Sequence, residues 1–231
     1  ILITGPAGHL TIPIVRRLAP DNDVWGLARF SNPEQQTMLE GLGVTCVKKD
    51  LAVDSLDDLP TDFDMVFHAG AMVAMDSERD MAYTFQVNVQ GTGRLIEHCR
   101  NVSTFVFCST GGVYARQEHP VRETDDYGAP IPAYSLSKIA AEQLVTYLAT
   151  KYEIPTIILR IGALDDGGDV YINGRRAHTR AHLSPLAWQE SFTVDVTALI
   201  RPCEDNILAI HGQDHYGMGG LWKPVVLYTQ P

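Results

Sequence analysis

The sequence has little positive charge. It holds 18 lysine and arginine residues against 28 aspartate and glutamate residues, which gives a formal net charge of −10. Because its basic residues form no cluster, the composition argues against a nucleic-acid partner. No apolar run is long enough to span a bilayer and no signal peptide is recognisable, so we expect a cytoplasmic protein without a membrane partner. The apolar fraction of 45% and the charged fraction of 20% are typical of a soluble globular protein.

Cysteines are also few and scattered. The chain has four, and none forms a C-x-x-C pair, which predicts buried thiols in a reducing cytosol. Two histidine pairs, His178 with His182 and His211 with His215, are each spaced by four residues. We expect strands and loops in that region, where this spacing does not bring ligands together, so no metal site is predicted.

Strand-like and helix-like runs alternate through the first part of the chain. This alternation predicts a doubly wound parallel sheet, the α/β Rossmann arrangement. The chain begins with Ile1 rather than Met, and we expect it to start inside the first strand. Strands are expected at residues 1–3, 24–28, 44–47, 65–68, 105–109 and 156–160.

A glycine-rich turn follows the first expected strand. Strand, glycine turn and helix in that order aim backbone N–H groups and a helix dipole at a pyrophosphate. Gly5 and Gly8 supply the tight turn and the close backbone approach, whereas Thr11 stands where the fingerprint has a third glycine. Tight packing of the helix on the strand is therefore an open question there, and a plain structural turn is the alternative. The residues predicted to contact a cofactor are Gly5, Ala7, Gly8, His9 and Leu10.

No carboxylate stands at the tip of the second expected strand. An NAD site usually has an acidic residue there, about twenty residues past the glycine turn, to bind the ribose hydroxyls. Here the tip reads Ala28, Arg29, Phe30, Ser31. Arg29 and Ser31 could bind a 2′-phosphate, so NADP is favoured over NAD. The alternative is that Arg29 is only a solvated charge at a strand end.

Tyr134 and Lys138 begin a run with helical periodicity. Residues four apart share one face of a helix, so the phenol and the ammonium group project to the same side. A cation beside a phenol favours the phenolate, and we therefore expect the pKa of Tyr134 to lie below its usual value of about 10. This would make Tyr134 a general acid and base near neutral pH.

Five features of the chain, taken in order, resemble the extended short-chain dehydrogenase/reductases, also called the NAD-dependent epimerase/dehydratase family. The resemblance covers residues 1–162. Each feature is weak alone, and their order and spacing make the resemblance specific. They are Thr4-Gly5-x-x-Gly8, Asp50-Leu51, His68-Ala69-Gly70-Ala71, Ser109-Thr110-x-x-Val113-Tyr114 and Tyr134-x-x-x-Lys138.

The resemblance implies roles for particular residues. Tyr134 would be the catalytic acid and base, Lys138 its partner and a ligand of the nicotinamide ribose, and Thr110 the hydroxyl that binds the substrate oxygen. Further cofactor-binding residues would be Asp50, Leu51, Ala69, Gly70, Ala71, Asn88 and, besides its catalytic role, Tyr134. For His68 and Asn88, a purely structural role as satisfied polar groups is an equal alternative.

The last seventy residues lack any long helical pattern. Short strands are expected at residues 170–172, 192–196, 206–210 and 225–228, with a hairpin turn at Asn173-Gly174. The region resembles the later strands of the jelly-roll sugar-binding domain of glycoside hydrolase family 2, with Trp222 and Val225 packed inward. Trp188 and Trp222 could stack on sugar rings, although core packing is favoured. That family's catalytic barrel is absent, so glycosidase activity is not expected.

The sequence therefore predicts a dinucleotide-binding domain over residues 1–162 and an incomplete β-rich, jelly-roll-like segment over residues 163–231. The expected function is that of an NAD(P)-dependent oxidoreductase or sugar-nucleotide epimerase or dehydratase. Its substrate would be a small molecule, a nucleotide sugar or a carbonyl compound, and a homodimer is compatible with the sequence. Two alternatives stay open: a non-catalytic nucleotide-binding protein whose β tail binds carbohydrate or a partner, and a chimeric chain with no working site.

Overall fold

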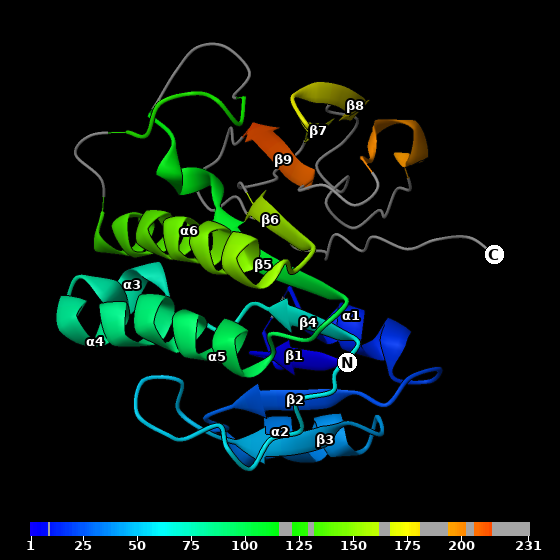
Figure 1. Ribbon diagram of the computed structural model, residues 1–231, viewed down its shortest axis with the longest axis vertical. Coiled ribbons are helices and arrows are strands. Elements are labelled where there is room, and N and C mark those ends of the chain that lie inside the picture. Colours follow the sequence, from blue (N-terminus) through cyan, green and yellow to red (C-terminus); the bar gives the residue numbers. More distant parts are fainter. Residues whose placement is uncertain are drawn as a thin grey trace.

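A computed structural model describes residues 1–8, 10–115, 122–128, 132–161, 167–180, 194–201 and 206–213. Within these residues the chain forms a nine-stranded sheet with the order β3-β2-β1-β4-β5-β6-β9-β7-β8 (Figure 1). The strands are β1 (Leu2–Thr4), β2 (Trp25–Ala28), β3 (Thr45–Lys48), β4 (Met65–His68), β5 (Thr104–Thr110), β6 (Thr156–Ile161), β7 (Gly167–Ile172), β8 (Arg175–Arg180) and β9 (Asn206–Gln213).

The first six strands are parallel, and their order is that of a doubly wound Rossmann sheet. The prediction of this fold is confirmed. The helices are α1 (Ile12–Leu18), α2 (Pro33–Glu40), α3 (Ala74–Ser77), α4 (Met81–Phe85), α5 (Thr92–His98) and α6 (Ala133–Tyr152), with a π-helix η1 (Gln86–Gly91) and two 3₁₀ turns, η2 (Gly111–Val113) and η4 (Thr197–Leu199).

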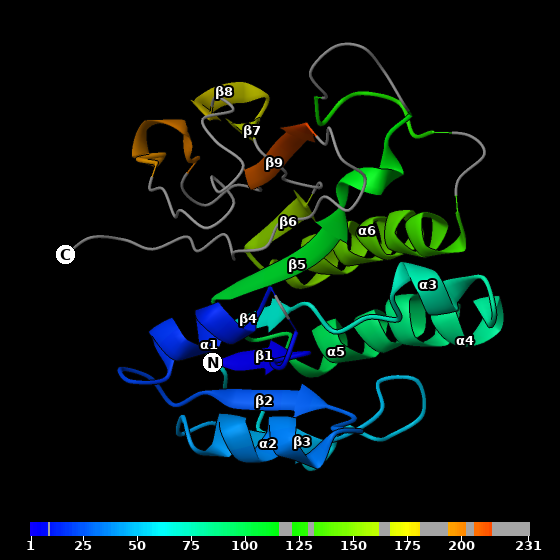
Figure 2. The same cartoon turned by 180° about the vertical axis from the view of Figure 1, so that it is seen from behind.

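Helices cover both faces of the parallel sheet. The two views show α3 to α6 on one face and α1 and α2 on the other (Figures 1 and 2). Neighbouring residues of one strand therefore enter different cores: Leu2 packs in the core under α5 and α6, and Ile3 packs in the core under α1 and α2. Burial on both faces explains why apolar residues stand next to one another in these strands, as Leu2 and Ile3 do.

The tail begins with the predicted hairpin. β7 and β8 pair antiparallel, and the two residues between them, Asn173 and Gly174, have φ angles of 50° and 75°. Positive φ at both central positions is the conformation of a type I′ turn, which Asn-Gly favours. This prediction is confirmed.

β9 joins the tail to the rest of the sheet. It pairs antiparallel with β7 and parallel with β6, so the described tail strands extend the Rossmann sheet. The jelly-roll resemblance therefore finds no support among the described residues. Trp188, Trp222 and Val225 lie outside those residues, as does the segment 162–166, so the division of the chain at residue 162 stays a prediction.

One expected strand is wrong in part. Residues 194–196, from the expected strand 192–196, are not a strand, and a 3₁₀ turn, Thr197–Leu199, follows them. Asp195 Oδ1 accepts a hydrogen bond of 3.0 Å from the Thr197 amide. Such a local side-chain contact competes with strand pairing and favours a turn.

The described thiols differ in burial. Cys99 and Cys108 are buried, Cys46 is half-buried, and all three are free. Burial raises the pKa of Cys99 and of Cys108 to about 12, so both thiols are protonated near neutral pH. The fourth cysteine, Cys203, lies outside the described residues. No helix in the described part of the chain is long and apolar enough to cross a membrane.

Candidate active site

The turn after β1 lies directly against the backbone that follows β4. Gly5 has a φ of +64°, and a Cβ atom there would lie 3.0 Å from the Cα atom of Gly70. A Cβ atom at Gly70 would lie 2.9 Å from Thr4 Oγ1. Both positions therefore need glycine, because a side chain at either one would push the turn away from the backbone of Ala69 and Gly70 or from Thr4. His9 lies outside the described residues.

Thr11, which stands where the fingerprint has a third glycine, packs beneath the turn. Its side chain is buried, and its hydroxyl lies within hydrogen-bonding distance of two carbonyl oxygens of the turn, 2.5 Å from that of Gly5 and 3.1 Å from that of Gly8. A Cβ atom at Gly8 would lie only 3.3 Å from the Thr11 hydroxyl oxygen. The threonine thus fits beneath the turn and stabilises it, so a third glycine is not required.

The first turns of α6 carry Tyr134 and Lys138 against the end of β5. Lys138 is buried, its ammonium group donates a hydrogen bond of 2.8 Å to the Cys108 carbonyl, and it lies 5.8 Å from the centroid of the Tyr134 ring. Thr110 ends β5. A Cβ atom at Gly112 would lie 3.4 Å from Thr110 Oγ1 and 3.0 Å from Ser135 Oγ, so the first turn of α6 lies beside Thr110.

The pKa values of the pair are set by burial. Burial raises the pKa of Tyr134 to about 12, with a smaller contribution from Cys108, and it lowers the pKa of Lys138 to about 8. The expected lowering of the Tyr134 pKa is therefore wrong for the free protein. The physical reason is that Lys138 donates to a backbone carbonyl instead of the phenol, so its charge does not offset the loss of hydration around the hydroxyl.

His68 and Thr92 form a buried chain of hydrogen bonds behind the turn. Burial lowers the pKa of His68 to about 3, so the ring is neutral. Thr92 uses its hydroxyl proton on the Asn88 carbonyl at 2.7 Å and therefore accepts from His68 Nε2 at 2.7 Å. Nδ1 must then accept from the Thr4 hydroxyl at 2.6 Å, while Thr4 Oγ1 accepts from the Gly70 amide at 2.8 Å. Both ring nitrogens of His68 therefore have a hydrogen-bond partner, which favours a structural role for this residue.

Asn88 lies beside the site without contacting Tyr134 by its side chain. Its Oδ1 accepts from the Met72 amide at 2.7 Å, and its Nδ2 donates to Ser137 Oγ at 2.9 Å. Ser137 in turn donates to the Tyr134 carbonyl at 2.7 Å. Through these hydrogen bonds Asn88 links the loop after β4 to the first turn of α6. Asn88 itself lies in the π-helix η1, an irregularity that is frequent at functional sites.

Arg29 and Asp50 are connected by a residue that the sequence did not suggest. Arg29 Nη1 donates to the Tyr83 hydroxyl at 3.3 Å, and that hydroxyl donates to Asp50 Oδ2. Burial and the hydrogen bond to Asp50 raise the pKa of Tyr83. A carboxylate thus lies one hydroxyl group away from Arg29. No local pattern could have predicted this contact, because Tyr83 follows Arg29 by 54 positions along the chain.

Two other predicted site residues, Leu51 and Ala71, lie in the segments that follow β3 and β4. Leu51 is buried, and its carbonyl accepts a hydrogen bond from Arg94. Ala71 follows β4, as do Ala69 and Gly70, at the carboxyl edge of the sheet. Doubly wound folds bind ligands at that edge.

Among the described residues, no three His, Cys, Asp or Glu side chains are grouped so as to hold a metal ion.

Two curated proteins are similar in sequence to this chain. The chain is 29% identical over 174 residues to an uncharacterized UDP-glucose epimerase, YtcB, of Bacillus subtilis, covering 69% of this chain and 55% of that protein. It is 31% identical over 189 residues to a 2-alkyl-3-oxoalkanoate reductase of Stenotrophomonas maltophilia, covering 77% of this chain and 54% of that protein. The chain thus spans about half the length of the curated relatives it matches.

A solved structure gives the same result. The chain resembles the UDP-N-acetylglucosamine 4-epimerase of Methanobrevibacter ruminantium, solved with UDP-N-acetylmuramic acid, with a TM-score of 0.63 and 25% identity. The likeness covers 69% of this chain and 53% of that one. The sequence pattern of one family matches residues 1–164, more than half of the chain. The chain belongs to the NAD dependent epimerase/dehydratase family.

Proposed function

We propose that this chain is the NAD(P)-binding part of an oxidoreductase or of a sugar-nucleotide epimerase or dehydratase, and that Thr110, Tyr134 and Lys138 form its reactive site. The observation that carries the proposal is the position of Tyr134 and Lys138 on one face of α6, beside the strand end that bears Thr110. The glycine turn after β1 opens at the same edge of the parallel sheet, where a dinucleotide would reach both.

The residues around that turn fit a dinucleotide. Gly5, Gly8 and Gly70 have no side chain where a Cβ atom would crowd its neighbours, which permits the tight turn that brings backbone close to a pyrophosphate in dinucleotide sites. Arg29 supports NADP, because a guanidinium group pairs well with a 2′-phosphate. Asp50 lies near Arg29 through Tyr83 and favours a ribose without that phosphate, so NAD is the second candidate.

The chemistry proposed for the chain's own residues is proton transfer and orientation. A bound nicotinamide supplies or accepts the hydride. Tyr134, with its raised pKa, is protonated near neutral pH and can give its phenolic proton to a carbonyl oxygen as the adjacent carbon is reduced. Thr110 would donate a second hydrogen bond to that oxygen. Lys138 would hold cofactor hydroxyls and, by its charge, favour the phenolate that remains.

The substrate class is a nucleotide sugar or a smaller carbonyl compound. The names of the two relatives above include both kinds, UDP-glucose in one case and a 2-alkyl-3-oxoalkanoate in the other. Because the chain spans about half of each relative, the residues that choose between these substrates are not identified by the likeness.

The test is direct titration of the chain with NADPH and NADH, followed by nicotinamide fluorescence. Turnover is then assayed with UDP-glucose, for both epimerisation and oxidation, and with a 3-oxoalkanoate. Tyr134→Phe and Thr110→Val should abolish turnover and leave cofactor binding intact. Tyr147→Phe, an exposed tyrosine of the same helix, is the matched control. Failure to bind either cofactor would exclude the proposal, and binding without turnover would support a non-catalytic nucleotide-binding protein.

A further inference from the structure

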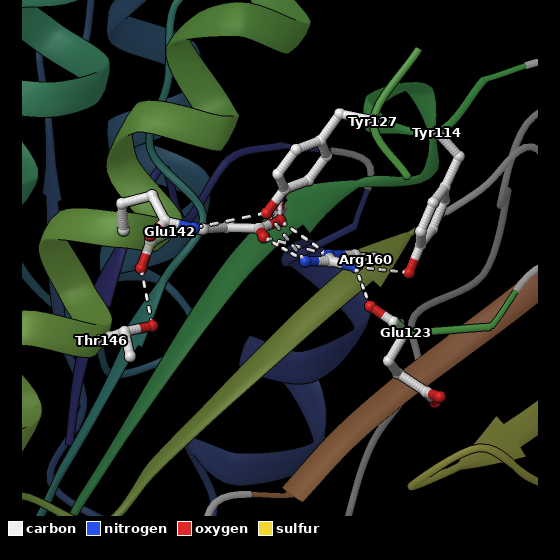
Figure 3. Close-up of polar contacts among 8 residues, drawn as sticks. Tyr114, Glu123, Tyr127, Glu142, Thr146 and Arg160 are labelled. Carbon is white, nitrogen blue, oxygen red and sulfur yellow. Dashed lines mark hydrogen bonds and ion pairs between the residues drawn. The ribbon is translucent and has the colours of Figure 1, made fainter. Parts of the chain in front are cut away.

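Arg160, in β6, uses all five of its N–H donors (Figure 3). Nε lies 3.1 and 3.0 Å from the two carboxylate oxygens of Glu142, and Nη2 donates to Glu142 Oε2 at 2.7 Å. The remaining donors bind three groups outside α6. These are the Tyr114 hydroxyl at 2.6 Å, the Glu123 carbonyl at 3.1 Å and the Tyr127 hydroxyl at 3.3 Å.

The guanidinium group of Arg160 lies against aromatic rings and is largely shielded from solvent. Arg160 is 8% exposed, and its guanidinium carbon lies 5.0 Å from the Tyr114 ring centroid and 5.5 Å from that of Tyr127. Burial alone would lower the pKa of Arg160, but the hydrogen bond and the charge of Glu142 raise it above its usual value. A buried ion pair is weak evidence for added stability, because desolvation offsets most of the attraction. A role in fixing the relative positions of its partners explains this arrangement better.

Glu142 connects Arg160 to the helix of the candidate site. It follows Lys138 by four residues and Tyr134 by eight, so the three side chains lie along one face of α6. Glu142 Oε1 also accepts a hydrogen bond from Ser109, the residue before Thr110 in β5. One carboxylate therefore ties α6 to both β5 and β6.

The other partners of Arg160 hold the segment 122–128 against the end of β5. Tyr114 and Tyr127 form an antiparallel bridge, and the Gly128 amide donates to the Val113 carbonyl at 3.0 Å. A Cβ atom at Gly128 would lie 2.9 Å from the Cα atom of Ala115, so the two backbones are in contact. Val113 ends the 3₁₀ turn that begins directly after Thr110. The segment thus lies next to the candidate site.

We infer that Arg160 is a positioning residue, which sets the segment 122–128 at a fixed place beside Thr110 and the Tyr134 face of α6. The segment forms a wall of the substrate site, and Arg160 holds that wall while its pair with Glu142 holds the helix. This inference rests on the proposed function for its catalytic consequence. The position of the segment itself can be measured without activity.

Three variants separate the parts of this arrangement. Arg160→Lys keeps a positive charge beside Glu142 but has three donors instead of five, so it cannot hold the segment as well. Tyr127→Phe removes the hydroxyl that Arg160 and Gln143 contact, on a side chain that is 37% exposed and tolerates the change. Tyr147→Phe on the outer face of α6 is the control.

Hydrogen–deuterium exchange gives the first measurement, on the full chain. In Arg160→Lys the amides of 122–128 should exchange about tenfold to thirtyfold faster, which corresponds to the loss of one or two net hydrogen bonds. Tyr127→Phe should have a smaller effect in the same segment. Exchange in β1 to β4 should be unchanged in both variants, and Tyr147→Phe should match the wild type throughout.

The second measurement uses UDP-glucose as the substrate and NADP⁺ as the hydride acceptor, with NADPH titration as the measure of cofactor affinity. Tyr127→Phe should raise the KM for UDP-glucose about threefold to tenfold at unchanged kcat and unchanged NADPH affinity, because it loosens only the wall. Arg160→Lys should also lower kcat. If amide exchange in 122–128 is unchanged in Arg160→Lys, or if the exchange rate rises evenly over the whole chain, the inference is overturned. Wild-type values of KM and kcat in Arg160→Lys would also overturn it. If the wild type does not turn over UDP-glucose, the hydrogen–deuterium exchange result alone decides whether Arg160 positions the segment. If the wild type binds neither NADPH nor NADH, the proposed function fails, and this outcome is independent of the exchange result.

Discussion

Lys138 donates its hydrogen bond to the backbone carbonyl of Cys108, at 2.8 Å, and not to the hydroxyl of Tyr134. The two residues that define the candidate site therefore lie on one face of α6 but do not hydrogen-bond to each other in the free protein. Burial controls the pKa of each, which leads to measurable effects of pH.

The first prediction concerns Lys138 and alkaline pH. Its pKa is lowered from 10.5 to about 8, so between these values the unfolded chain binds more protons than the folded one, and this group makes stability rise with pH. At about pH 7 the buried charge costs free energy. Lys138→Met should therefore raise the unfolding free energy there by about 1–3 kcal/mol, after allowance for the lost hydrogen bond. The gain should disappear near pH 10.5.

Urea unfolding of both proteins at several pH values measures this difference. Titrating groups common to both chains cancel in the comparison. A Lys138→Met protein that is less stable than the wild type by the same amount at every pH would contradict the prediction.

The second prediction concerns His68 and acid. Its pKa falls from 6.5 in the unfolded chain to about 3 in the folded one, so the folded state stays neutral while the unfolded state takes up a proton. Stability linked to this group is complete above pH 6.5 and is lost as the pH falls toward 3, with a slope of up to about 1.4 kcal/mol per pH unit. His68→Gln should be less stable near neutral pH but should lose less stability on acidification. Equal slopes for the two proteins would argue against a buried neutral histidine.

The third prediction compares two glycines with positive φ. A Cβ atom at Gly5 (φ +64°) would lie 3.0 Å from the Gly70 Cα atom, whereas a Cβ atom at Gly43 (φ +85°) would have nothing within 4 Å. Alanine at either position carries the backbone strain, about 1 kcal/mol or more. Gly5→Ala should also displace the turn and weaken NADPH binding about tenfold or more, while Gly43→Ala should bind normally. Similar cofactor affinity in the two variants would show that the turn does not hold the cofactor.

The fourth prediction is cofactor choice. Arg29 should make NADPH bind several-fold tighter than NADH, since a phosphate–arginine contact is a charge-assisted hydrogen bond. Arg29→Glu should reverse the order. Fluorescence titration with both cofactors measures the ratio, and equal affinities that do not respond to the substitution would disprove the assignment of Arg29.

The fifth prediction is that this chain binds its cofactor better than it catalyses a reaction. The residues proposed to bind the cofactor are the glycine turn, Arg29, Asp50 and Lys138, and all of them lie within the family match. Catalysis also needs a positioned substrate, which can account for roughly 7–11 kcal/mol of barrier. The chain covers about half the length of these relatives, so we expect its turnover to be slow. Any residual activity should vanish in Tyr134→Phe, and turnover above about 1 s⁻¹ on a carbonyl substrate would refute this prediction.

The sequence by itself determined the features that depend on local conformation. The glycine turn, the shared face of Tyr134 and Lys138 and the Asn173-Gly174 hairpin each follow from φ preferences or helical spacing within a few residues. The six parallel strands were also predictable, because strands buried on both faces are rich in consecutive apolar residues.

The tertiary structure alone decided the features that depend on distant contacts. Burial reversed the expected shift of the Tyr134 pKa, Tyr83 came between Arg29 and Asp50, and β9 entered the sheet beside β6 instead of forming part of a separate jelly roll. Arg160 shows the same limit: its partners Tyr114, Glu123 and Glu142 come from separate parts of the chain. The free energy of each of these contacts depends on desolvation and on long-range packing, which are properties of the folded chain and not of any short stretch of it.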